Sequence, residues 1–88
     1  MSLTTNQVSV GTAATVIYAP STANPVHLHI HNVDNTDAVY LGGSDVTTSN
    51  GLVLQKLDDL EIILRPGNQI YAVSNKAGHI VSYLKQDY

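Results

Sequence analysis

Apolar and polar residues alternate along residues 26–33 more regularly than elsewhere in the chain. In an extended strand successive side chains point to opposite faces, so this alternation separates two sets of side chains. The apolar set is Val26, Leu28 and Ile30. The polar set consists of three histidines, His27, His29 and His31. The pattern therefore predicts a strand whose apolar face points into a core.

Seven other segments are short, rich in β-branched residues and closed by turn residues. They are residues 7–10, 14–19, 38–41, 52–55, 60–65, 69–74 and 80–84. Pro66 followed by Gly67 is typical of a type II turn, and Asn50 followed by Gly51 is typical of a tight turn with positive φ angles. No stretch of ten or more residues carries the apolar spacing of a helix.

Seven or eight short strands predict an all-β fold, and we expect a small antiparallel β-sandwich, either jelly-roll-like or immunoglobulin-like. We expect it to form a single domain over residues 7–88. Residues 1–6 offer little apolar anchoring, so they are expected to form a flexible N-terminal arm. Such an arm could add a strand to the exposed edge of a neighbouring sheet.

The composition favours a component of an assembly. With 88 residues and no cysteine, a small core has to be stabilised without disulfides, and association is the remaining common means. Only 12% of the residues are charged, which is about half the usual fraction in globular proteins. Interface cores are depleted in Lys, Glu and Asp in the same way.

The charge distribution argues against two classes of partner. The net charge is −3, and the four basic residues are scattered through the second half of the chain. A nucleic-acid-binding surface needs clustered basic residues, so no nucleic-acid partner is expected. No run approaches the ~18 apolar residues of a membrane span, and no basic region of a signal peptide is present. We therefore expect a soluble, unexported protein without a membrane partner.

The three histidines of residues 26–33 are the sharpest candidates for chemistry. Two of them could share a zinc ion, with a further ligand such as His79, Asp34 or Asp37. They could also form a pH sensor, because protonation near pH ~6 would place like charges side by side. The simpler interpretation, which we adopt, is that they are the polar face of an amphipathic strand. No metal site and no other cofactor are therefore expected.

Little in the sequence supports catalysis. Asp58, Asp59 and Glu61 form a cluster of carboxylates that could divide acid and base roles, but a turn would leave Asp58 and Asp59 solvated. No GxSxG nucleophile motif, phosphate-binding loop or HExxH metal motif is present. The prediction is that the chain is not an enzyme and has no catalytic residues.

Tyrosine supplies all of the aromatic content. Its apolar ring and polar hydroxyl suit half-buried contacts at interfaces, although packing within a sheet is the simple alternative. We select four tyrosines as interface candidates, Tyr40, Tyr71, Tyr83 and Tyr88. Tyr88, at the end of the chain, is expected to reach another chain most readily.

The succession of local motifs resembles that of a known group of proteins. Residues 26–53 contain HNV, a polar turn and then AVYLGGSDVTTSNGLVL, and residues 60–74 read LEIILRPGNQIYAVS. This order of an HN-containing strand, a VYLGG strand, a DVT loop, an NG turn and an IYAV strand is similar to small all-β capsid decoration and minor capsid proteins of tailed bacteriophages. The matching pieces cover about half of the chain.

The resemblance implies a structural virion protein, most specifically a capsid decoration, or cement, protein. Such a protein binds the outside of a phage head as a homo-oligomer, with a trimer favoured, and stabilises contacts between subunits of the major capsid protein. Its location would be the capsid surface, after assembly in the host cytoplasm. The alternatives are a head-tail connector or tail component, a host-surface or carbohydrate-binding β module, and a metal enzyme with a cupin-like barrel built on the HxH pair.

Overall fold

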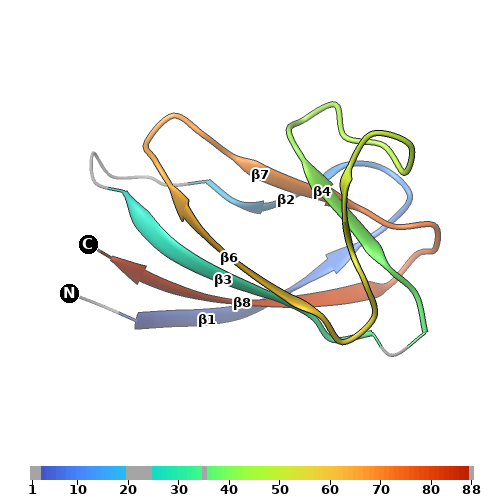
Figure 1. Cartoon of the computed structure of the whole chain (residues 1–88), viewed down its shortest axis with the longest axis horizontal. Coiled ribbons are helices and arrows are strands. Elements are labelled where there is room, and N and C mark those ends of the chain that lie inside the picture. Colours follow the sequence, from blue (N-terminus) through green and yellow to red (C-terminus); the bar gives the residue numbers. More distant parts are fainter. Residues whose placement is uncertain (1–2, 20–24, 35, 88) are drawn as a thin grey trace.

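The computed structural model describes residues 3–19, 25–34 and 36–87, and eight strands lie in these ranges (Figure 1). In chain order they are β1 (Leu3–Val10), β2 (Thr15–Tyr18), β3 (Val26–Asn32), β4 (Val39–Gly42), β5 (Leu52–Leu54), β6 (Asp59–Leu64), β7 (Ile70–Val73) and β8 (His79–Asp87). Each predicted segment corresponds to one strand, so the all-β fold is confirmed. The described ranges contain no helix that is long and apolar enough to cross a membrane.

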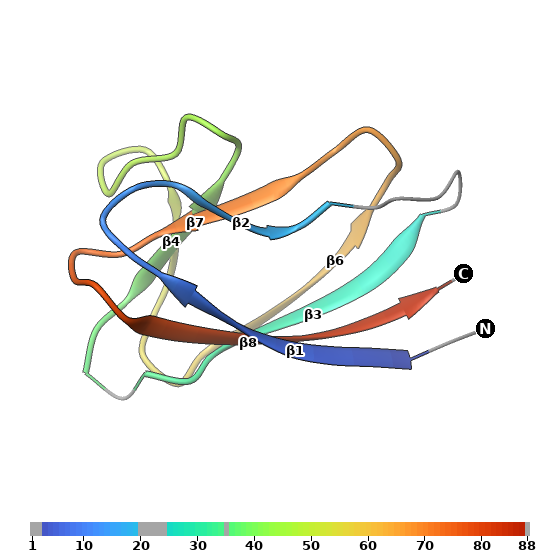
Figure 2. The ribbon, with the colours of Figure 1, turned by 180° about the vertical axis from the view of Figure 1, so that it is seen from behind.

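The strands form two four-stranded antiparallel sheets packed as a β-sandwich (Figures 1 and 2). One sheet, here called the long sheet, has the order β1-β8-β3-β6. The other, the short sheet, has the order β2-β7-β4-β5. Each strand of the long sheet thus has a chain neighbour at the same position of the short sheet: β1 with β2, β8 with β7, β3 with β4, and β6 with β5. This is the arrangement of a jelly roll, one of the two sandwich types that the sequence predicts.

The core lies between the two sheets and contains the predicted inward set of β3. Val26, Leu28 and Ile30 are at most 1% exposed. They pack with apolar residues of the short sheet, such as Leu41 and Ala72. Burying a leucine or isoleucine of this kind contributes about 1.5–3 kcal/mol to the free energy of unfolding. The alternating pattern along β3 therefore reports correctly which face is buried.

The first strand begins earlier than the hydrophobic pattern predicts. Residues 3–6, which the sequence assigns to the flexible arm, form half of β1 and pair with β8 in a register that places Leu3 opposite Gln86 and Asn6 opposite Tyr83. Their side chains are exposed, so backbone pairing rather than apolar burial holds this segment. That is why the pattern of side chains gives no sign of it. The remaining residues of the expected arm, 1 and 2, lie outside the described ranges.

The two predicted turns differ in outcome. At Pro66–Gly67 the Asn68 N–H donates to the Arg65 carbonyl over 3.1 Å, and Gly67 has a φ of +86°, as a type II turn requires. At Gly51 the expected positive φ is not observed. Glycine is needed there for space instead, because a Cβ atom would collide with neighbouring side chains.

Candidate docking surface

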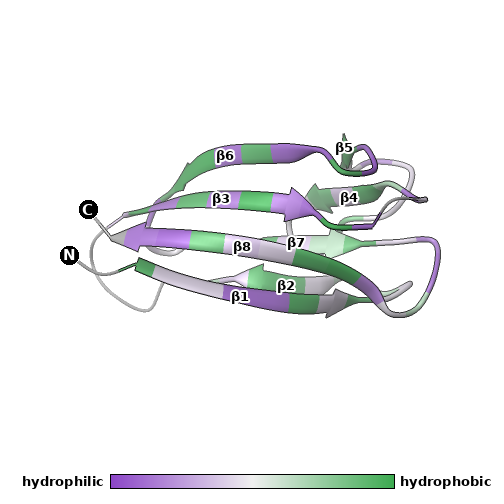
Figure 3. Ribbon diagram, turned by 90° about the horizontal axis from the view of Figure 1, so that it is seen from below, coloured by the Kyte–Doolittle hydropathy of each residue, from purple (hydrophilic) through white to green (hydrophobic). Residues whose placement is uncertain are grey.

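None of the four strands of the short sheet contains a charged residue. Their sequences are TVIY, VYLG, LVL and IYAV, which combine β-branched and aromatic residues that favour strands. The charged residues that lie in strands belong to β6 and β8 of the long sheet. Figure 3 shows the same division, with the hydrophilic segments on strands of the long sheet. The strands of the short sheet therefore carry no charged side chain on either face.

Four side chains on the outer side of this sheet are exposed or half-buried, and we call them the tyrosine face: Val16, Tyr40, Val53 and Tyr71. Val16 is paired with Tyr71 across β2 and β7, and Tyr40 with Val53 across β4 and β5. Val16 and Val53 keep 43% and 47% of their surface exposed, and both tyrosines are half-buried. Apolar side chains together with phenol groups are typical of the centre of a protein interface.

Val46, in the loop between β4 and β5, packs against Gly42 and Gly51. A Cβ atom on Gly42 would lie 2.8 Å from Val46 Cγ2, and one on Gly51 would lie 3.0 Å from the same atom and 2.7 Å from Tyr40 Cβ. Only glycine leaves room for Val46, which is buried beside both. The VYLGGSDVTTSNG stretch, part of the resemblance noted above, thus forms a compact loop against Tyr40.

The structure places the other two predicted tyrosines elsewhere. The ring of Tyr83 packs edge-on against that of Tyr18, with 5.6 Å between centroids and 62° between planes. Lys85 Nζ lies 5.9 Å from the centroid of the Tyr18 ring. Tyr83 therefore packs at the margin of the core and not on the tyrosine face. Tyr88 lies outside the described residues.

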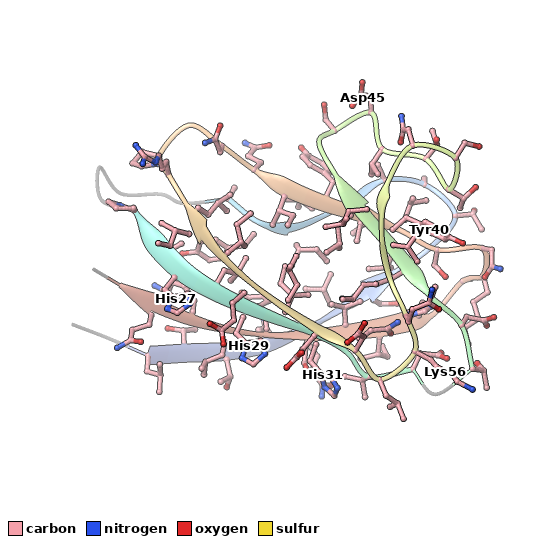
Figure 4. The ribbon with its side chains drawn as sticks, viewed as in Figure 1. His27, His29, His31, Tyr40, Asp45 and Lys56 are labelled. Carbon is pink, nitrogen blue, oxygen red and sulfur yellow. The ribbon has the colours of Figure 1, made fainter. Side chains whose placement is uncertain are left out.

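The three predicted histidines lie along β3 on the outer face of the long sheet (Figure 4). His27 Nε2 is 3.2 Å from Glu61 Oε2, and His29 Nε2 is 2.9 Å from Asp59 Oδ2. Each of these two imidazoles therefore has a carboxylate of β6 as its neighbour.

The residues considered as additional metal ligands do not join these histidines. His79 is buried within the sandwich, and Asp34 and Asp37 bind Lys76. Asp58 lies in the turn before β6, where its side chain accepts a hydrogen bond from the Asp59 N–H. Within the part of the chain that the structure describes, no three His, Asp or Glu side chains form a group that could hold a metal ion.

A buried polar network, which the sequence did not lead us to expect, lies at one end of the sandwich. The Asn32 side-chain amide donates to three carbonyl oxygens, those of Asp37, Leu54 and Gln55, each at 3.1 Å. Its Oδ1 therefore faces His79 Nε2, 2.7 Å away, and must accept a hydrogen bond from it. The sequence could have indicated this network, because Asn32 follows Val26, Leu28 and Ile30 at the next inward position of β3.

The same reasoning gives the tautomer of His79. Because Nε2 carries the proton, Nδ1 is an acceptor, and it receives the Ser74 hydroxyl over 2.9 Å. Burial lowers the pKa of His79, since an apolar surrounding disfavours the charged ring. Serine, histidine and asparagine here resemble a nucleophile, a base and an orienting group. All three are at most 1% exposed, however, so the arrangement joins β3, β8 and the end of β7 and offers no surface to a substrate.

A charged cluster lies near this network, at the surface. Lys76 Nζ is 2.5 Å from Asp34 Oδ2 and 3.2 Å from Asp37 Oδ2. The hydrogen bond from Lys76 holds the pKa of Asp34 well below its usual range, and hydrogen bonds from Thr36 and from the Asp37 N–H act in the same direction. Asp34 in turn raises the pKa of Lys76. The cluster ties the β3–β4 loop to the turn before β8.

Comparison with known proteins gives one informative match. No protein-family model matches the chain, and no curated protein matches it in sequence. The fold is similar to that of a solved structure from Bacillus endospore appendages, described as a novel family of disulfide-linked pili. The TM-score is 0.64 over 98% of this chain and 85% of that one, with 14% sequence identity. At this identity the likeness concerns the fold alone.

Proposed function

We propose that this protein is a non-enzymatic structural component of a bacteriophage virion, a decoration protein that docks on the outside of the capsid through its tyrosine face. The observation that carries the proposal is the absence of charge from all four strands of the short sheet. Burying the four side chains of the tyrosine face removes no ion from water, which is the costly step when charged surfaces are buried.

The opposite face of the sandwich supports a one-sided mode of docking. There, histidines of β3 face Asp59 and Glu61 of β6, and such exposed pairs remain well solvated. A decoration protein needs one face for the shell and another for the surrounding water, and the two sheets divide along this line. The resemblance of the HNV, VYLGG and IYAV pieces to capsid decoration proteins points to the major capsid protein as the partner.

The proposed role requires binding contact with the capsid and no catalysis. A protein that binds the assembled shell more tightly than the separated subunits stabilises the assembly through that difference in affinity. Catalytic groups are not required, and the serine and histidine that resemble a catalytic pair are buried. A rigid sandwich placed across two capsid subunits would raise the free energy needed to separate them.

The proposal is tested by co-sedimentation of the purified protein with heads of the phage that encodes it. We expect Val16→Lys and Val53→Lys each to weaken binding at least about tenfold, because each places a charge in a buried interface. The matched control is Ile63→Lys, which adds the same charge at a position 54% exposed on the outer face of the long sheet. Full binding by the first two variants, or loss of binding by the control alone, would contradict the proposal.

A subunit of a filament is a second candidate, favoured by the fold shared with the endospore appendage protein. That protein forms disulfide-linked pili, whereas these 88 residues contain no cysteine. A filament of this chain would therefore depend on non-covalent contacts alone. Electron microscopy of the purified protein distinguishes the candidates, because a filament subunit assembles into fibres without heads and a decoration protein does not.

A further inference from the structure

The sandwich has four edge strands, β1 and β6 in the long sheet and β2 and β5 in the short sheet. An edge strand presents unpaired backbone N–H and C=O groups, to which another chain can add a strand. Natural proteins limit this by making edge strands short, by interrupting them with a bulge or by placing charges on them.

Three of the edges are protected. β5 has only three residues. β2 has four, and its register shifts between Val16 and Tyr18. β6 is longer, but it carries the carboxylates of Asp59 and Glu61. Each of these strands thus has a feature that opposes the addition of a further strand.

β1 has none of these features. It is eight residues long, its sequence LTTNQVSV contains neither charge nor proline, and it pairs with β8 from Leu3 to Val10 without a register shift. The side chains of its first five residues are exposed, with Leu3 64% exposed. This half of the strand lies at the margin of the sandwich in Figure 2, and a side chain of β1 itself, that of Asn6, accepts a hydrogen bond from the Gln7 N–H over 2.8 Å.

We propose that β1 is a self-pairing edge, and that two copies of this protein associate by antiparallel pairing of their β1 strands about a two-fold axis. The pairing joins two four-stranded sheets into one continuous sheet. It also removes the unprotected edge of both copies, so the contact closes on itself and does not propagate.

The features of the other edges and the charges of the chain indicate that the strand that pairs with β1 is β1 of a second copy. Pairing of β1 with β2, β5 or β6 of another copy is opposed by the protecting features of those strands. Pairing of β1 with β1 brings no charged residue of either strand together, although each copy carries a net charge of −3. The product is a dimer, in place of the trimer implied by the resemblance. The inference goes beyond capsid docking, because it requires only the protein itself.

Sedimentation equilibrium of the full chain, from micromolar to millimolar concentrations, tests the proposal. We expect a monomer–dimer equilibrium that is weakened at least about tenfold in the double variant Thr5→Lys/Gln7→Lys, which places four lysines along the joined strands. The control Ser44→Lys/Thr48→Lys adds the same charge in the exposed β4–β5 loop and should dimerise like the wild type. A monomer throughout, a trimer, or equal weakening by both double variants would overturn the proposal.

Two further measurements distinguish a loss of β1 pairing from a folding defect in the β1 variant. Raising the salt concentration to about 1 M shortens the Debye length to about 3 Å, so it should restore dimerisation of a folded variant. Amide hydrogen exchange of the wild type should show the edge-facing amides of β1 exchanging rapidly in dilute solution and slowly in concentrated solution, Gln7 excepted, because its N–H already donates to Asn6 Oδ1. Failure of the salt rescue in a variant with native circular dichroism, or exchange in β1 that does not depend on concentration, would overturn the pairing.

Discussion

His79 Nε2 lies 2.7 Å from Asn32 Oδ1, and both side chains are fully buried at one end of the sandwich. Asn32 ends β3 and His79 begins β8, so the bond joins neighbouring strands of the long sheet. The Asn32 amide also donates to the carbonyl oxygen of Leu54 in β5, which belongs to the short sheet. This single asparagine therefore connects both layers.

Replacement of Asn32 by alanine should lower the free energy of unfolding by about 3 kcal/mol, because the His79 N–H and the carbonyl oxygens served by Asn32 would lose their partner inside the protein. Urea unfolding followed by circular dichroism measures the change. Asn68→Ala, at an exposed turn position, is the matched control and should change stability by less than about 0.5 kcal/mol. Similar values for the two variants would mean that the buried network contributes little.

Stability should decrease in mild acid because of His79. Its pKa is lowered from 6.5 in the folded protein, so below about pH 6.5 the unfolded chain binds a proton that the folded chain does not. The contribution of His79 is therefore present above pH ~6.5 and is lost as the pH falls toward the folded pKa, with a slope of at most about 1.4 kcal/mol per pH unit. Unfolding by urea between pH ~7.5 and ~5 measures this slope.

The comparison protein for this titration is His79→Gln, which keeps a polar side chain but removes the titrating ring. The other three histidines are common to both proteins, so the difference between the two slopes isolates His79. Asp34 does not interfere, because Lys76 holds its pKa far below this pH range. Equal slopes for the wild type and His79→Gln would contradict the assignment of a buried, neutral His79.

Gly51→Ala should destabilise the fold by about 1–3 kcal/mol, the usual cost of an additional methyl group in a filled space. The new Cβ would lie 2.7 Å from Tyr40 Cβ and 3.0 Å from Val46 Cγ2. Gly11→Ala is the control, since nothing lies within 4 Å of a Cβ at that position. Thermal unfolding of both variants checks the prediction, and an unchanged melting temperature for Gly51→Ala would show that the loop has room for a methyl group.

Lys76→Met should raise the pKa of Asp34, because it removes the largest cause of the depression. The value should remain below the usual range, since the bonds from Thr36 and from the Asp37 N–H persist. Titration of the Asp34 carboxyl carbon by NMR measures the shift, with Lys56→Met as the control that leaves it unchanged. A return of the pKa to its ordinary value would mean that the loop opens when Lys76 is removed.

The strands, the layers and the inward face of β3 could be predicted from the sequence because they follow from the alternation of side chains. The first half of β1 could not, since residues 3–6 are held by backbone hydrogen bonds that leave no mark on side-chain polarity. The role of Gly51 was predicted for the wrong reason. A glycine required for φ and one required for space look alike until the position of Val46 is known.

The candidate site was predictable only in part. Tyr40 and Tyr71 were selected individually, but their position on one face depends on the pairing of β4 with β7, which is distant in sequence. Tyr83 was selected on the same ground, its residue type, but it packs against Tyr18 and does not lie on the tyrosine face. Asn32 and His79 could have been recognised as polar residues at inward positions, had the alternation been followed to the next inward position of each strand.

Hydroxyl-radical footprinting of the protein, free and bound to phage heads, shows which face docks on the capsid. We expect oxidation of Tyr40 and Tyr71 to fall on binding, while His27 and His29 on the opposite face react as in the free protein. Protection of the histidines with undiminished oxidation of the two tyrosines would contradict docking through the tyrosine face.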